Sequence, residues 1–174
     1  MYPERKTRPA LLVSTMHMVS LLNILSPFYL IATIDSSDGL FSPVSYEVAS
    51  TVNQYNTLFC SEYKVNTDDT MSKIPGVLYG RYQGDTYAGG NPWVLSTAAL
   101  ANLFYRGAVF IASGQGVPDA KALSMWQKAF NSPTALSSDS STLAKTFAIA
   151  GDSVLARFFL FIFRLFNIFI NTFS

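Results

Sequence analysis

The chain has 174 residues, of which 49% are hydrophobic and 13% charged, and these proportions exclude a disordered or strongly acidic protein. Its formal net charge is +1, from 12 basic and 11 acidic side chains, so the basic surface that nucleic-acid binding requires is missing and we expect no nucleic-acid partner. The length suits one domain.

The first predicted element is the apolar run of residues 10–25, which follows Arg5, Lys6 and Arg8. Basic residues before an apolar run are typical of a signal peptide. Polar residues interrupt this run and no clean cleavage site follows it, so a buried helix of the domain is an equally good interpretation.

Two later helices share a start signal, a polar capping residue followed by proline. Ser42-Pro43 precedes apolar residues at helical spacing, namely Val44, Val48, Val52, Tyr55 and Phe59. Asn91-Pro92 precedes residues 93–112, which are so apolar that we expect an inner helix, buried over most of its circumference.

Two more helices are predicted downstream. Val117-Pro118-Asp119 opens one whose buried face holds Ala122, Trp126 and either Ala129 or Phe130. Residues 141–155 form the other, with Leu143, Phe147 and Val154 on its apolar side, after a serine-rich connector at residues 132–141. The predicted fold class is therefore all-α.

Neither the cysteine nor the histidine of the chain indicates a metal, disulfide or catalytic site. Cys60 is the single cysteine, so it has no disulfide partner within the chain and no zinc cluster is present. His17 is the single histidine and has no nucleophile motif beside it, so we interpret it as an ordinary helix residue. We expect no cofactor and no metal.

The most informative segment is residues 76–93, which combines glycines and aromatic residues with Arg81 and Asp85, four positions apart. Glycine allows close approach of backbone, aromatic faces stack on sugar rings, and an arginine held by a carboxylate can donate hydrogen bonds to hydroxyls. The pattern is suited to carbohydrate binding. A glycine-rich turn with one ion pair and aromatics packed on helix ends is the alternative.

The same segment resembles a known family. The run Gly80-Arg-Tyr-Gln-Gly-Asp-Thr-Tyr-Ala-Gly-Gly-Asn-Pro-Trp93 is similar to the loop and inner helix of fungal glucoamylases, glycoside hydrolase family 15. The similarity covers most of residues 11–157. It implies a partial (α/α)6 toroid of the six-hairpin kind, and an inverting exo-hydrolysis that releases glucose from starch-like α-1,4-glucans or maltooligosaccharides. Secretion or a vacuolar location would follow from the family.

Site residues carried over from the resemblance are substrate-binding ones. Arg81 matches the arginine that hydrogen-bonds substrate hydroxyls, and Asp85 matches its carboxylate partner. Tyr87 and Trp93 match aromatic residues that line the sugar subsites, and Tyr82 is their neighbour in the motif. Gln83, Gly84 and residues 88–89 depart from the family pattern, which affects the shape of the loop more than its chemistry.

Catalytic residues are not assigned. An inverting glycosidase needs one carboxyl group to protonate the leaving oxygen and a second to activate water. The family's segments that carry these groups have no counterpart here. Ser61-Glu62-Tyr63 superficially resembles the base segment, but it precedes the arginine loop and matches a non-catalytic helix end. We therefore expect the chain alone to be inactive.

Seven of the fourteen phenylalanines lie between Phe158 and Phe173, where the resemblance stops. One interpretation is an altered coding sequence, such as a retained intron, since AT-rich codons encode Phe, Ile and Asn. A membrane anchor is the second, although sixteen helical residues span about 24 Å against a hydrocarbon core of about 30 Å. An ordinary core helix is the third.

The expected organisation is thus a partial glucoamylase-like domain at residues 10–157 and an unrelated apolar tail at residues 158–174. A partial ring leaves helix faces uncovered, so we expect poor solubility of the chain alone. The alternative function is a non-catalytic, membrane-associated or glucan-binding protein. The oligomeric state is not predicted.

Overall fold

The computed structural model describes residues 41–68, 76–86 and 89–172. Within this part of the chain the regular elements are helices and no strand occurs: α3 (Tyr46–Phe59), α4 (Lys64–Thr67), α6 (Val94–Ala112), α7 (Ala120–Ala129) and α8 (Ser140–Thr172). The all-α prediction is confirmed, and the arrangement is consistent with part of an (α/α)6 toroid. The predicted helix at residues 10–25, with His17, lies outside the described residues.

Helix α3 begins three residues later than the Ser42-Pro43 signal predicts. Ser45 is the N-cap, and its side chain accepts a hydrogen bond from the backbone N–H of Val48. The hydroxyl of Ser42 instead accepts from the N–H of Val44, so it closes a turn ahead of the helix. The predicted apolar face is buried, and the helix ends at Cys60, whose side chain is exposed.

Helix α6 begins at Val94, and Trp93 stands at its N-cap without a side-chain hydrogen bond, so the prediction that Asn91 starts the helix is wrong. The expected burial is confirmed for the larger part of this helix, 56% of which is buried, but one strip along it is exposed. Val94, Leu95 and Val109 are 48%, 50% and 64% exposed, while the opposite face, which includes Leu100, Leu103 and Ile111, is fully buried.

Helix α7 follows its sequence signal closely. The carboxylate of Asp119 accepts a hydrogen bond of 2.7 Å from the backbone N–H of Ala122 and caps the helix. Ala122, Trp126 and Ala129 form its buried face, which confirms the prediction.

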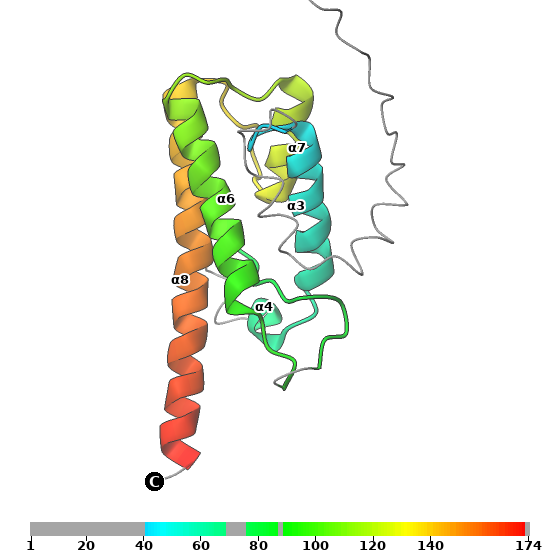
Figure 1. Ribbon diagram of the computed structural model, residues 1–174, viewed down its shortest axis with the longest axis vertical. Coiled ribbons are helices and arrows are strands. Elements are labelled where there is room, and N and C mark those ends of the chain that lie inside the picture. Colours follow the sequence, from blue (N-terminus) through cyan, green and yellow to red (C-terminus); the bar gives the residue numbers. More distant parts are fainter. Residues whose placement is uncertain (1–40, 69–75, 87–88, 173–174) are drawn as a thin grey trace, which may run out of the picture.

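Helix α8 is longer than predicted. Asp139 accepts a hydrogen bond of 2.8 Å from the N–H of Thr142 at its start, and the helix then continues past Leu155 to Thr172 without a break. No glycine or proline follows Leu155, so nothing in the local sequence stops the helix. Its C-terminal end projects beyond the rest of the described structure (Figure 1).

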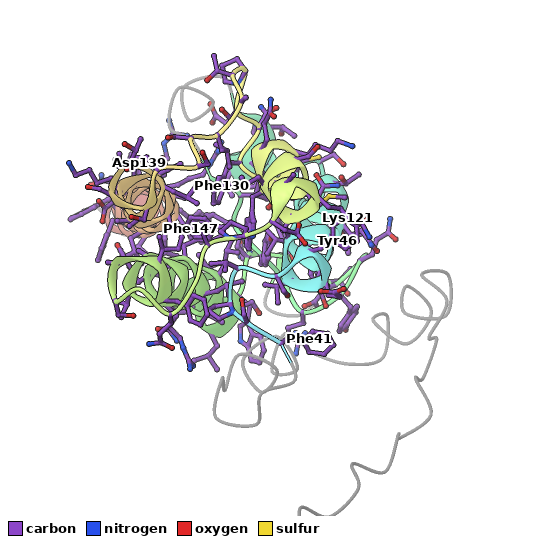
Figure 2. The ribbon with its side chains drawn as sticks, turned by 90° about the horizontal axis from the view of Figure 1, so that it is seen from above. Phe41, Tyr46, Lys121, Phe130, Asp139 and Phe147 are labelled. Atoms are coloured by element: carbon purple, nitrogen blue, oxygen red, sulfur yellow. The ribbon has the colours of Figure 1, made fainter. Side chains whose placement is uncertain are left out.

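The helices pack in two pairs, α6 against α8 and α3 against α7 (Figure 1). Gly107 allows the close approach of α6 to α8, because a β-carbon there would lie 2.6 Å from the ring of Phe147. Phe104, Trp126, Phe130 and Phe147 form a cluster of edge and stacked ring contacts. Figure 2 shows Phe130 and Phe147 of this cluster in the interior, between the helices. The indole N–H of Trp126 donates to the carbonyl of Val44, which ties α7 to the start of α3.

Candidate functional site

The segment ahead of Arg81 is held by side chains that are distant in the sequence. The amide of Asn66 both accepts from the N–H of Leu78 and donates to its carbonyl, at 3.0 and 2.9 Å. The guanidinium of Arg157, which is 5% exposed, donates to the carbonyls of Gly76, Val65 and Asn66. The backbone that leads into the site is therefore fixed to α4 and α8.

Tyr79 anchors the same segment in the core. Its hydroxyl lies 2.7 Å from Oδ1 of Asn56 and 3.2 Å from the carbonyl of Val52, both on α3. Its carbonyl accepts from the N–H of Trp93, and its N–H donates to Thr97 on α6. Burial raises the pKa of Tyr79 well above the usual tyrosine value, so the hydroxyl stays protonated and remains a donor.

Arg81 and Asp85 form the pair that their spacing predicts. Nε of Arg81 lies 2.7 Å from one carboxylate oxygen of Asp85, and Nη2 lies 2.6 Å from the other. This two-bond geometry fixes the plane of the guanidinium as well as its position. The Asp85 side chain is 4% exposed and the Arg81 side chain 25% exposed, so the carboxylate is buried behind a cation that reaches the surface.

Two aromatic rings flank the guanidinium. Cζ of Arg81 lies 5.5 Å from the ring centre of Tyr82 and 5.9 Å from that of Trp93, both within the range of cation–π attraction. Tyr82 is 44% exposed and Trp93 is half-buried. The structure thus brings together four of the five predicted site residues. Tyr87, the fifth, lies outside the described residues.

The sequence did not predict two residues that support the segment of this pair, Tyr63 and Arg157. The hydroxyl of Tyr63 occupies the space beside Gly80, where a β-carbon would lie only 1.6 Å from it. Gly80 therefore makes room for Tyr63 and not for a ligand. Burial, together with the nearby carboxylate of Asp85, raises the pKa of Tyr63 to about 12. Arg157 could have been noticed as a charged residue on a helix that is otherwise apolar on that side.

Among the described residues, no group of three or more His, Cys, Asp or Glu side chains is placed to hold a metal ion. The site offers a hydrogen-bond donor that is held by a buried carboxylate and lies near two aromatic rings. Such a site can bind a neutral molecule rich in hydroxyl groups.

Comparison with known proteins agrees with the family resemblance seen in the sequence. The sequence model of Glycosyl hydrolases family 15 matches residues 16–161, which include every described site residue. The helices of the described residues agree with this match, which makes the protein a glycosidase by family. The chain belongs to glycosyl hydrolases family 15, the family of the glucoamylases it resembles.

Curated relatives include three fungal proteins. Glucoamylase 1 of Rhizopus oryzae is 30% identical over 131 residues, which cover 68% of this chain and 21% of that protein. The glucoamylase of Blastobotrys adeninivorans is 38% identical over 78 residues, which cover 41% of this chain and 12% of the relative. Glucoamylase-1 of Schizophyllum commune is 37% identical over 65 residues, which cover 37% and 11%. The chain thus spans about a fifth or less of these relatives. No solved structure matches it significantly.

Proposed function

We propose that this chain recognises the terminal glucose units of α-1,4-linked glucans such as starch, glycogen and maltooligosaccharides, through Arg81 and the residues around it. The relatives named glucoamylase support this substrate class. The observation that carries the proposal is the bidentate pair of Arg81 with the buried Asp85, close to the rings of Tyr82 and Trp93.

The chemistry of the proposal follows from that geometry. A glucose unit presents hydroxyl groups at its edge and C–H bonds on its faces. The guanidinium would donate to the hydroxyls, and the buried carboxylate keeps it from turning away. Tyr82 and Trp93, and Tyr87 by the family resemblance, would contact the faces of the sugar rings.

We assign no hydrolytic step to the chain. In glucoamylases the reaction is an inverting hydrolysis that needs a general acid and a general base. The 174 residues contain neither of the segments that would supply them. We therefore propose binding without glucose release for this chain by itself, and a share in hydrolysis only where both carboxyl groups are also present.

The test measures the affinity of the full chain for maltoheptaose by titration calorimetry, together with glucose release. Arg81→Lys should weaken binding by at least about tenfold, because an ammonium group cannot make the two parallel bonds to Asp85. Arg106→Lys is the matched control, since Arg106 lies on α6 beside a separate hollow of about 350 Å³, lined by Pro43 and Phe110 among others.

Three results bear on the proposal. Binding that Arg81→Lys weakens and Arg106→Lys does not would support it. A wild-type chain with no measurable affinity for maltoheptaose would refute it. Release of glucose by the wild-type chain would refute the assignment of binding without hydrolysis.

A further inference from the structure

The turn that carries Arg81 is held at its far end by Glu62, which belongs to the connection between α3 and α4. Oε1 of Glu62 accepts a hydrogen bond of 2.6 Å from the backbone N–H of Gly84, 22 residues away in the sequence. A hydrogen bond from an N–H to a carboxylate is among the stronger ones in proteins.

Gly84 itself needs such support. Its φ is +74°, a left-handed conformation that glycine adopts easily, and no atom lies within 4 Å of the place where a β-carbon would be. Packing therefore does not fix this part of the turn. The hydrogen bond to Glu62 ties the Gly84 backbone to another segment of the described structure.

The residue after Glu62 fixes the opposite end of the turn. Tyr63 is 3% exposed, and its ring stacks on that of Phe59 at 5.9 Å with an interplanar angle of 6°. Its hydroxyl fills the space beside Gly80. Two consecutive residues thus contact Gly80 and Gly84, the glycines on either side of Arg81.

The position of Arg81 depends on this turn. Arg81 and Asp85 lie four residues apart, but the backbone between them is a turn and not a helix, so helical geometry does not align them. Their side chains meet only while the backbone from 81 to 85 keeps its shape. Gly84 is part of that backbone.

We propose that Glu62 is a positioning residue for glucan recognition: by holding the amide of Gly84 it keeps the Arg81–Asp85 pair in the orientation that binds the sugar. This inference rests on the proposed function. It gives Glu62 a role unlike that of a catalytic base, because its carboxylate acts on the backbone of the turn.

The experiment compares four variants of the full chain in maltoheptaose titrations and in hydrogen exchange of residues 80–86. Glu62→Ala removes the acceptor, and Glu62→Asp keeps the charge but shortens the side chain by one methylene group. Both should weaken binding by about tenfold and speed exchange at Gly84. Glu62→Gln keeps an acceptor oxygen at the same reach and should stay within about threefold of wild type. Glu47→Ala, at an exposed glutamate in the first turn of α3, should change neither property.

The outcomes separate the two proposals. If the wild type binds maltoheptaose and Glu62→Ala or Glu62→Asp binds as well as wild type, the role of Glu62 is refuted and the proposed function stands. If the wild type does not bind, the proposed function fails and the inference fails with it. If Glu62→Ala does not fold, the difference between the Asp and Gln variants decides the question, and equal affinities for those two overturn the inference.

Discussion

Tyr63 and Tyr79 lie in one aromatic cluster with Tyr55 and Phe59, yet their hydroxyls differ in hydrogen bonding. The hydroxyl of Tyr79 reaches two acceptors on α3, whereas the buried hydroxyl of Tyr63 has no hydrogen-bond partner in the described structure. A buried polar group without a partner costs about 1–3 kcal/mol.

Tyr63→Phe should therefore leave the free energy of unfolding unchanged or raise it by about 1 kcal/mol, while Tyr79→Phe should lower it by about 1–2 kcal/mol. Urea unfolding of the two variants, which lose the same atom, measures the difference. Equal destabilisation by both would show that the Tyr63 hydroxyl is paired in solution.

Asp139 gives a pH-dependent prediction. The backbone N–H of Thr142 donates to its carboxylate, which lowers the pKa of Asp139 in the folded chain below the usual aspartate value. The stabilisation is present above the unfolded pKa of about 3.9 and is lost as the pH falls through the lower folded pKa. The melting temperature of wild type should thus fall more than that of Asp139→Asn between about pH 5 and pH 2. Parallel curves for the two proteins would contradict this.

Contacts between residues close in the sequence were predictable, whereas contacts with residues distant in the sequence were not. The Arg81–Asp85 pair joins residues only four positions apart, and the glycines and aromatic residues around them mark the segment in the sequence. The contacts of Glu62 with Gly84, of Asn66 with Leu78 and of Arg157 with Gly76 join residues 22, 12 and 81 positions apart. Such contacts depend on how the helices pack, which no local pattern encodes.

At the scale of elements, the helices with regular apolar spacing were predicted, and their ends were less predictable. Ser42 and Ser45 both suit an N-cap, and the choice between them depends on the turn that Ser42 closes with Ser45. The exposure of Leu95 and Val109 on α6 could not be predicted, because a continuous apolar run does not say how many neighbours cover it.

The crossing of α6 and α8 depends on Gly107. In Gly107→Ala the new methyl group would meet the ring of Phe147 at 2.6 Å. Overpacking costs about 1–3 kcal/mol, and the better helix propensity of alanine returns about 1 kcal/mol. We expect a net loss of about 1 kcal/mol in the free energy of unfolding.

The matched measurement places Gly107→Ala in a Phe147→Leu background, where the contact is relieved and the loss should be smaller. Denaturant unfolding of the four proteins completes this double-mutant cycle. A loss of the same size in both backgrounds would mean that Phe147 is not the side chain that limits this crossing.

At the scale of the whole molecule, the second half of α8 carries an exposed apolar face. Phe159, Leu160, Ile162 and Phe163 are 56%, 40%, 39% and 64% exposed. Within the part of the chain that the structure describes, α6 and residues Ser140–Arg164 of α8 are long and apolar enough to cross a membrane by length and composition. The apolar window of α6 is 56% buried, whereas that of α8 is only 28% buried. The ion pair of Arg164 with Asp68, at 2.7 Å, fastens this half of α8 beside α4.

We predict that this apolar face drives self-association or adsorption to lipid. Phe159→Glu combined with Phe163→Glu should increase the fraction of monomer in light scattering and reduce flotation with phosphatidylcholine vesicles, because both side chains are on one face. Ile149→Glu, at a side chain that is 62% exposed in the first half of the same helix, is the control. Unchanged association in the double variant would show that other surfaces cause it.

The exposed thiol of Cys60 has a practical consequence. Since it is the single cysteine of the chain, one reagent modifies one place, without any background substitution. That place is at the end of α3, two residues before Glu62. A fluorescent probe on this sulfur, whose emission depends on its surroundings, would follow movement of the neighbouring Glu62 connection and the Arg81 turn in real time as sugar is added.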